Sequence, residues 1–278
     1  MSYRIQNTPH RIVRQPFFSF GSSMRCYHVR RRFQTHDPEV CAVLKGILFD
    51  LDGTLLDIRI DTFLDCYFAA LENAVRGSFG QETDTDLVMQ AVMSGTSAMM
   101  RPHPGETNRK AFYREFERAT GVDLVSHWPV FEKFYVEVFP SLRGELGPAR
   151  GAKEALAAAR TCGLKVALAT NPIFPRTAIV HRLSWAGFEP DAVDVITDYE
   201  TMHACKPSAE YFRQTAAMLG LDPRDCLMVG DDRVLDLAAA DVGMRTFYVG
   251  EDPNVSADYR GGLPELASLL TRTCLDQD

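Results

Sequence analysis

The stretch KGILFDLDGTLLD, residues 45–57, carries two aspartates at the point where a buried strand would end. The apolar run 47–49 is followed by Asp50 and Asp52, with one leucine between them and Gly53 directly after. Side chains alternate along a strand, so residues two apart share a face. Two carboxylates this close repel each other unless a positive charge lies between them or one of them holds a proton. That energetic cost indicates a functional site.

A second interpretation of the same stretch is a tight β-hairpin. Asp-Gly between two apolar runs is a strong short-range hairpin signal. Taken alone, residues 45–57 fit a hairpin and a functional site about equally well. The rest of the chain has to decide between them.

Helical and strand-like segments alternate along the chain after about residue 146. The predicted helices are 152–163, 175–187, 208–220 and 233–243, and the predicted strands are 164–170, 192–197, 226–231 and 245–250. This alternation predicts an α/β fold with a doubly wound parallel sheet. A lone hairpin fits that sheet poorly, whereas a buried parallel strand has a continuous apolar sequence, as residues 46–49 nearly have.

The segment 58–145, between the first strand and the alternating region, has a helical pattern instead. From Ile60 onward, apolar residues recur at spacings of three and four. Further helices are predicted over 106–121 and 127–139. Thr107 or Asn108 is the expected cap of the first of these, Gly121 its stop, and a proline lies near the first turn of the second. These helices predict a small bundle inserted into the α/β core.

Polar residues stand where strands end or helices begin, and in a doubly wound sheet ligands bind outside the carboxyl ends of the strands. The residues are Asp50, Asp52, Thr170, Asn171, Lys206, Asp231 and Asp236. Each has an ordinary explanation as a turn, a helix cap or a solvated charge. Their convergence on one edge of one sheet is much harder to explain in that way, so they predict a site.

The residue types at this edge suit phosphoryl chemistry. Asp50, Asp52 and Asp231 would bind a hard divalent cation, and Mg²⁺ typically uses one or two carboxylates with water and substrate phosphate. Lys206 adds a positive charge and Thr170 a hydroxyl for phosphoryl oxygens. A carboxylate nucleophile that forms an aspartyl-phosphate divides one difficult displacement into two easier ones, and a second carboxylate can transfer the protons.

The segments ILFDLDGTL, ATN, CKP and VGDDRVLD resemble the four ordered motifs of the haloacid dehalogenase superfamily of phosphohydrolases, over roughly residues 44–250. The resemblance implies that Asp50 is the nucleophile and Asp52 the general acid and base. It also implies that the helical segment 58–145 is the small cap domain of this family, which closes over the site and selects the substrate.

The resemblance further assigns the cation and phosphoryl ligands. Asp50, the backbone carbonyl of Asp52, and Asp231 would hold Mg²⁺. Asp236 would support that site, through water or through Lys206. The phosphoryl group would be bound by Thr170, by the backbone around Asn171, and by Lys206.

The second aspartate narrows the reaction within the superfamily. Its dehalogenases lack a residue equivalent to Asp52, and its phosphonate-cleaving branch has alanine there. The sequence therefore predicts a Mg²⁺-dependent phosphatase of a small phosphate monoester, such as phosphoglycolate, a sugar phosphate or a nucleotide. Two alternatives stay open: a phosphomutase of the same superfamily, and a non-catalytic relative that binds phosphorylated metabolites or a partner protein.

The loop SAMMRPHPGETNRK, residues 97–110, is where we expect substrate choice to be made. Its Arg101, His103 and Arg109 could meet a second anionic group of the substrate. Such residues are more often simply solvated, so they are not assigned to the site.

Charge is unevenly distributed along the chain. Residues 1–36 carry seven arginines and no acidic residue; the whole chain has a net charge of −7, so residues 37–278 carry −14. An acidic body argues against a nucleic-acid-binding surface. The chain also lacks the run of about 18 apolar residues that predicts a membrane-spanning helix. We therefore expect a small phosphorylated metabolite as the partner of a monomer or homodimer, without nucleic acid or membrane.

Three regions are expected. Residues 1–40 would be a basic, disordered extension, an organellar targeting peptide, or a segment ahead of a true start at Met24. Residues 41–57 with 146–278 would form the Rossmann-like catalytic core, and residues 58–145 the cap.

The seven cysteines are odd in number and form no Cys-x-x-Cys pair, which predicts free thiols and a cytoplasmic location, or organellar import if residues 1–36 are a transit peptide.

Overall fold

The computed structural model of the protein describes residues 44–76 and 84–275. All of them belong to one unit of contacts. The prediction for residues 1–40 lies outside the described residues.

A six-stranded sheet forms the centre of the described chain, with the strand order β5-β4-β1-β6-β7-β8 and every pair parallel. Its strands are β1 (Gly46–Phe49), β4 (Lys165–Leu168), β5 (Val195–Ile196), β6 (Cys226–Gly230), β7 (Arg245–Tyr248) and β8 (Tyr259–Arg260). In β1, Phe49 is paired with Leu168 on one side and Val229 on the other, so the three strands end within one residue of each other. The hairpin interpretation of residues 45–57 is therefore wrong, because β1 pairs in parallel with strands far along the chain.

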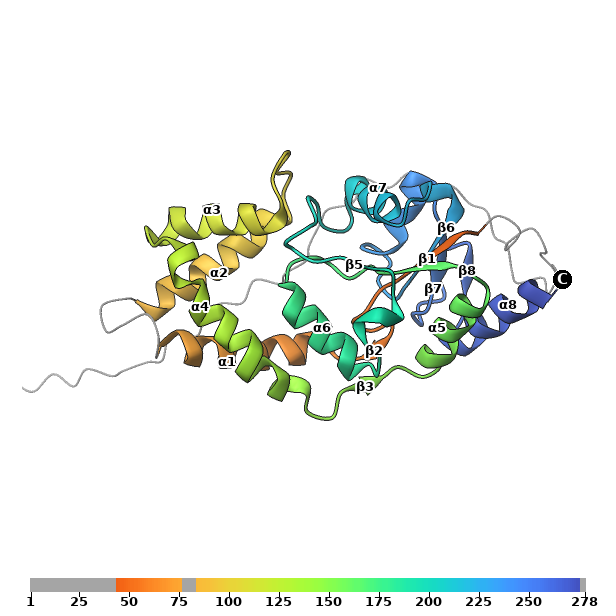
Figure 1. Ribbon diagram of the computed structural model, residues 1–278, viewed down its shortest axis with the longest axis horizontal. Coiled ribbons are helices and arrows are strands. Elements are labelled where there is room, and N and C mark those ends of the chain that lie inside the picture. Colours follow the sequence, from red (N-terminus) through yellow and green to blue (C-terminus); the bar gives the residue numbers. More distant parts are fainter. Residues whose placement is uncertain (1–43, 77–83, 276–278) are drawn as a thin grey trace, which may run out of the picture. The chain divides into compact units, whose positions relative to one another are not determined.

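Helices cover both faces of this sheet (Figure 1). Ile47 and Phe49 point to the face packed by α5 (Ala152–Thr161), α6 (Arg176–Trp185) and α8 (Leu263–Leu275). Leu48 points to the opposite face, which α7 (Ala209–Met218) and the 3₁₀ turn η5 (Leu237–Val242) cover. The alternation of side chains along β1 thus separates two cores. The predicted doubly wound α/β fold is confirmed.

The remaining helices lie between two short strands, β2 (Leu56–Asp57) and β3 (Gly147–Pro148), which pair antiparallel. They are α1 (Ile60–Arg76), α2 (Thr85–Met99), α3 (Asn108–Thr120), α4 (Leu124–Lys133), the π-helical turn η1 (Phe134–Val138) and the 3₁₀ turn η2 (Phe139–Arg143). Buried aromatic side chains on α1, α3 and α4 belong to one apolar cluster, and Phe63 of α1 packs against Trp185 of α6. The predicted run of helices is therefore present, and its apolar stripes are core.

Two of these helices show how local chemistry sets the ends. Thr107 caps α3 by accepting a hydrogen bond from a backbone N–H three residues on, and Gly121 ends the helix with a φ of 69°. Helix α4 begins at Leu124 rather than at residue 127, because the side chain of Asp123 accepts a backbone hydrogen bond at its start. As a result Pro129 lies inside the helix rather than in its first turn.

The helix predicted over 233–243 is reduced to the 3₁₀ turn η5. The carboxylate of Asp232 accepts hydrogen bonds from the backbone of Val234 and Leu235, at 2.7 and 2.9 Å, and so holds the chain in a turn. Beyond residue 250, β8 and α8 extend the fold past the predicted elements. Two further 3₁₀ turns, η3 (Pro190–Ala192) and η4 (Pro223–Asp225), precede β5 and β6.

The cysteine prediction is partly wrong. Cys66, Cys205 and Cys226 are free thiols, whereas Cys162 is disulfide-bonded.

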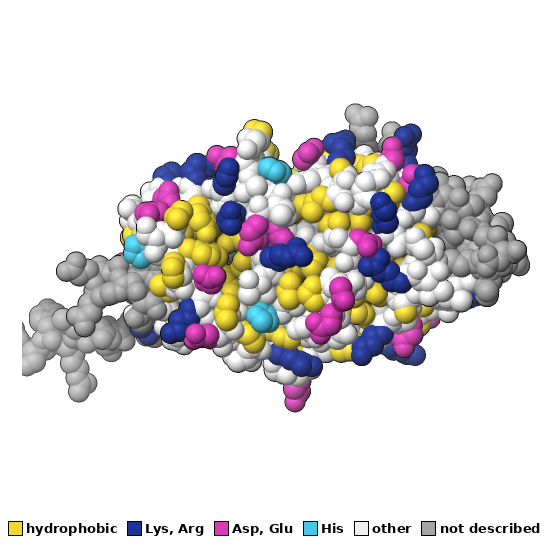
Figure 2. Space-filling view, in the orientation of Figure 1, with side chains coloured by type: hydrophobic (Ala, Val, Ile, Leu, Met, Phe, Trp, Pro, Cys, Tyr) yellow, Lys and Arg dark blue, Asp and Glu magenta, His cyan; other side chains and the backbone are white. Residues whose placement is uncertain are grey.

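Among the described residues, no helix is long and apolar enough to span a membrane. On the face shown in Figure 2, basic side chains alternate with acidic ones.

Candidate active site

Asp50 stands at the carboxyl end of β1, in the centre of the sheet. Its backbone N–H continues the ladder to the carbonyl of Val229 at 2.9 Å, which fixes the direction of its side chain. The residue is only 8% exposed, and its Oδ1 accepts a hydrogen bond from Nζ of Lys206 at 2.7 Å. A buried carboxylate is thus paired with a buried cation.

Lys206 joins two carboxylates. Besides Asp50, its Nζ donates to Oδ1 of Asp236 at 2.6 Å, and the lysine side chain is 1% exposed. Burial alone would lower the pKa of Lys206, but the negative charges of Asp236 and Asp50 outweigh it and raise the pKa above its usual value. Lys206 is therefore a permanently charged ammonium at this edge of the sheet.

Asp231 follows β6 and faces the turn after β1. Its Oδ1 accepts a hydrogen bond from Oγ1 of Thr54 at 3.2 Å. Gly53 makes this approach possible: its φ is +86°, and a Cβ there would lie 2.5 Å from Oδ2 of Asp231. Burial and the nearby charge of Asp50 raise the pKa of Asp231 to about 6. Bringing Asp231 beside Asp50 therefore costs free energy.

Three carboxylates form a group that suits a metal ion. Asp50, Asp231 and Asp236 each offer an oxygen, and these oxygens lie within 4.8 Å of one another. The oxygens of Asp236 are already engaged, one by Lys206 and the other by the backbone N–H of Asp232 at 2.9 Å. Burial raises the pKa of Asp236, against the opposing charge of Lys206. Asp50 and Asp231 are thus the better ligands, and their oxygens fit a hard divalent cation.

Asp52 does not join this group through its side chain. Its Oδ2 accepts a hydrogen bond from Nη1 of Arg182, a residue of α6 that is only 1% exposed. Its Oδ1 is buried and has no hydrogen-bond partner among the described residues. Burial raises the pKa of Asp52, as does the charge of Asp50, while Arg182 opposes the change. The two aspartates that open the motif therefore contact different cations.

Thr170 and Asn171 follow β4, and each is held by hydrogen bonds to residues further along the chain. The carbonyl of Thr170, which is buried, accepts hydrogen bonds from two side-chain hydroxyls, those of Thr197 at 2.8 Å and Tyr211 at 2.9 Å. The side chain of Asn171 accepts a hydrogen bond from the backbone N–H of Lys206 at 3.1 Å. The strand end after β4 thereby positions the lysine.

The structure brings the seven predicted residues to one edge of the sheet. The sequence does not reveal which of them contact which partner: Asp50 contacts Lys206, whereas Asp52 contacts Arg182. Sequence reasoning missed Thr54 and Arg182. For Arg182 a signal exists: it follows Ala178 by four residues and Ile179 by three, which places it on the apolar face of the predicted helix. An arginine on a core-facing stripe needs a buried anion.

The loop 97–110 is more tightly held than a solvated loop. His103 is 7% exposed, and its ring nitrogens lie 2.6 Å from the carbonyl of Arg101 and 2.8 Å from Oδ1 of Asn108. Asn108, at the start of α3, is fully buried and donates from Nδ2 to the carbonyl of Pro172 at 2.9 Å. The ring of His103 is thus committed to holding this loop beside the strand end after β4.

Together these groups can hold an anion and attack it. The ammonium of Lys206 and the carboxylate of Asp231, which suits a cation, lie beside Asp50. Two residues on, Oδ1 of Asp52 has no hydrogen-bond partner within the described part of the chain. Positive charge placed around an electrophilic centre stabilises the negative charge that develops there in a displacement.

Comparison with known proteins places the chain in a group of hydrolases. A profile of haloacid dehalogenase-like hydrolases matches residues 44–242. An N-acetylmuramic acid 6-phosphate phosphatase of Pseudomonas aeruginosa is 30% identical over 208 residues, which are 74% of this chain and 81% of that protein. A phosphoglycolate phosphatase of Aquifex aeolicus is 26% identical over 189 residues, 68% of this chain and 76% of that protein.

A solved structure supports the fold. The chain is similar to a HAD phosphatase from Thermococcus onnurineus, with a TM-score of 0.52 and 22% sequence identity, covering 82% of this chain and 98% of that one.

Proposed function

Because this chain belongs to the haloacid dehalogenase-like hydrolases, we propose that it is a Mg²⁺-dependent phosphatase that hydrolyses a small phosphate monoester through a phosphorylated aspartate. The observation that carries the proposal is the buried chain of contacts from Asp50 through Lys206 to Asp236, with Asp231 within metal-binding distance. The two relatives named above, aligned over 74% and 68% of this chain, are phosphatases of small phosphate esters.

In the first step, a carboxylate oxygen of Asp50 attacks phosphorus as the bond from phosphorus to the ester oxygen breaks. Asp52 gives a proton to the departing ester oxygen. In the second step, water attacks the phosphorylated Asp50, Asp52 takes a proton from that water, and phosphate leaves. Lys206 remains charged throughout and offsets the negative charge around phosphorus.

Asp50 and Asp231 would hold the magnesium ion through their carboxylates, and Asp52 through its backbone carbonyl. When bound, the ion neutralises the phosphoryl oxygens and removes the repulsion between the two carboxylates. Thr170 and Asn171 would bind the phosphoryl group together with Lys206. Asp236 accepts a hydrogen bond from Nζ of Lys206 and so holds the lysine side chain in position.

We also propose that helices α1 to α4 act as the cap over a core made of the flanking segments. The support is positional: the helices lie between β2 and β3, close to the end of β1, and the start of α3 contacts the loop after β4. A cap in that position excludes water from the phosphorylated aspartate and contacts the group esterified to phosphate.

The test is phosphate release from a panel of esters, including N-acetylmuramic acid 6-phosphate, phosphoglycolate, sugar phosphates and nucleotides, with magnesium and then with EDTA. We expect magnesium-dependent release from one compound far above the others. Asp50→Asn is the control, because it removes the nucleophile while keeping the size of the side chain. Turnover that is unchanged in this variant would contradict the proposed mechanism.

A further inference from the structure

Arg182 is the buried charge that the proposed chemistry leaves unexplained. It lies on α6, 130 residues from Asp52 along the chain, and Nη1 donates to Oδ2 of that aspartate. Its Nε and Nη2 are buried and have no hydrogen-bond partner among the described residues. Unpaired buried donors cost free energy, and a buried ion pair is a weak source of stability compared with packed apolar side chains. Stability alone therefore gives a poor reason for an arginine here.

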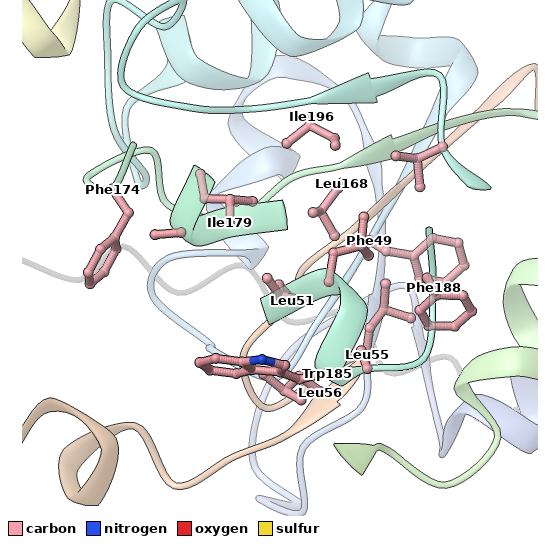
Figure 3. Close-up of a cluster of buried hydrophobic side chains, with 14 of the residues drawn as sticks. Phe49, Leu51, Leu55, Leu56, Leu168, Phe174, Ile179, Trp185, Phe188 and Ile196 are labelled. Carbon is pink, nitrogen blue, oxygen red and sulfur yellow. The ribbon is translucent and has the colours of Figure 1, made fainter. Parts of the chain in front are cut away.

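The guanidinium is held rigidly. Its central carbon lies 4.6 Å from the ring centre of Phe174, a residue of the loop that leads into α6. Ile179 and Leu183 flank Arg182 on the same helix and are fully buried. Figure 3 shows Ile179 on the helix near Leu51 and Leu168, with Phe174 apart from them on the preceding loop. Buried neighbours on the helix and the ring of Phe174 thus hold the guanidinium in position.

Phe174 is in turn held by residues of the helices between β2 and β3. The ring of Phe174 packs against Tyr67 of α1, with centroids 5.3 Å apart. The hydroxyl of Tyr67 lies 2.8 Å from that of Tyr135, in the π-helical turn η1. Phe174, which packs on the guanidinium, is thus itself held by aromatic side chains of α1 and η1.

These contacts make the two oxygens of Asp52 unequal. Oδ2 is engaged by Arg182, while Oδ1 is buried and unpaired among the described residues. A general acid must present one oxygen within hydrogen-bond reach of the leaving atom, and a displacement of about 1 Å can cost about 100-fold in rate. A fixed Oδ2 leaves Oδ1 as the oxygen that can transfer a proton.

We propose that Arg182 is a positioning residue that orients Asp52 for proton transfer through Oδ1. This inference rests on the proposed function. In the first step, Oδ1 gives its proton to the ester oxygen while the bond from that oxygen to phosphorus breaks and the bond from Asp50 to phosphorus forms. In the second step, Oδ1 takes a proton from the attacking water as phosphate leaves Asp50. In this role Arg182 acts on the reaction only through its contact with Asp52.

The experiment compares kcat/KM for two esters: the alkyl phosphate preferred in the panel, whose alkoxide needs a proton to leave, and 4-nitrophenyl phosphate, whose nitrophenolate leaves without one. This quantity reports steps up to phosphorylation of Asp50, so slow hydrolysis of the intermediate does not affect it. We expect Asp52→Asn to lower kcat/KM for the alkyl ester by about 100-fold or more and to change the nitrophenyl value little. Arg182→Met should show the same selectivity with a loss of about 10- to 100-fold on the alkyl ester.

Three variants separate positioning from a structural role. In the Asp52→Asn background, adding Arg182→Met should cause no further loss, because the arginine acts only through Asp52. This double variant also leaves no carboxylate buried without its cation, so it provides a result even if the single variant fails to fold. Arg182→Lys should restore part of the alkyl-ester activity. Arg160→Met is the control. Arg160 forms an ion pair with Asp194, at 2.7 Å, and not with Asp52, so its replacement should leave kcat/KM for both esters unchanged.

An equal loss on both esters in Arg182→Met, or a further loss in the Asp52→Asn background, would overturn the proposal. So would a gain of activity, which would mean that the arginine holds Asp52 away from the substrate. A wild-type protein that releases no phosphate from any ester overturns the proposed function, and this inference with it. An active wild-type protein whose Arg182 variants show no selectivity for the leaving group overturns this inference alone.

Discussion

Replacement of Lys206 by methionine tests whether the buried ammonium compensates the buried carboxylates. Methionine keeps most of the length and the apolar stem of lysine but removes its charge. In the structure, Nζ lies 2.7 Å from Asp50 and 2.6 Å from Asp236, and the side chains of Lys206 and Asp236 are 1% and 2% exposed. Breaking a buried ion pair by removing one partner costs about 3–5 kcal/mol, because the remaining charge is left uncompensated. We expect a loss of that size in the free energy of unfolding at pH 7.5.

The assay is urea unfolding of the wild-type and variant proteins in EDTA, so that no divalent cation replaces the ammonium. With a slope of about 2–3 kcal/mol per molar urea, the midpoint should fall by about 1–2 M. Lys45→Met is the matched control: Lys45 contacts Asp225 at the same distance, 2.7 Å, but its side chain is 64% exposed, so solvent screens the pair. We expect little change in that variant.

The loss of unfolding free energy in Lys206→Met should also depend on pH, and the raised pKa of the buried Asp236 decides in which direction. Burial already raises the pKa of Asp236, and removal of Lys206 raises it further. A carboxyl whose folded pKa lies above its unfolded value takes up a proton on folding, so its destabilising effect disappears as the pH falls through the folded pKa. Lys206→Met should therefore lose less stability at pH 5 than at pH 7.5. A variant that loses no more than Lys45→Met at pH 7.5 would refute this reasoning.

Three further perturbations probe the surroundings of the site. Asn108→Ala should lower the free energy of unfolding by about 2 kcal/mol, because it leaves buried partners unsatisfied, whereas the exposed Asn254→Ala should not; thermal melts measure both. Magnesium should raise the melting temperature more at pH 7.5 than at pH 5.5, because the pKa of Asp231 is raised to about 6 and a protonated carboxyl binds no metal. Gly53→Ala should lower magnesium affinity, measured by calorimetry, at least about 10-fold by displacing Asp231. Gly105 has a similar positive φ, +81° against +86°, but open space where a Cβ would stand, so Gly105→Ala should leave magnesium affinity unchanged.

Each of these has a result that would contradict it. Equal melting temperatures for the two asparagine variants would mean that the buried amide contributes nothing. A magnesium effect that is the same at both pH values would place Asp231 outside the metal site. Equal magnesium affinity in the two glycine variants would mean that the space beside Gly53 does not matter.

The centre of the fold and the edge that carries the site can be predicted because their signals are local. Residues 46–49 are apolar and continuous, and the polar residues that follow strands must meet where parallel strands end. Pairing depends on distant residues, however. That Asp50 contacts Lys206 while Asp52 contacts Arg182 follows from packing, which brings together side chains 156 and 130 residues apart.

The errors have the same origin. The segment 233–243 has a helical pattern, but backbone hydrogen bonds to the carboxylate of Asp232 hold the chain in a turn there. His103, which the sequence leaves unassigned, is fixed by tertiary contacts: its ring contacts Asn108, whose side chain donates to the carbonyl of Pro172. In each case side-chain hydrogen bonds override a local preference.

The most direct test of the proposed mechanism is to trap the phosphorylated aspartate. Asp52→Asn lacks the group that takes a proton from water, so with magnesium and 4-nitrophenyl phosphate it should form the intermediate and hydrolyse it slowly. Borohydride reduces an aspartyl-phosphate to homoserine, which peptide mass spectrometry can locate. We predict homoserine at position 50, dependent on substrate and magnesium. Turnover by the wild-type protein with no modification at Asp50 in either protein, or with modification at another residue, would contradict the proposed mechanism.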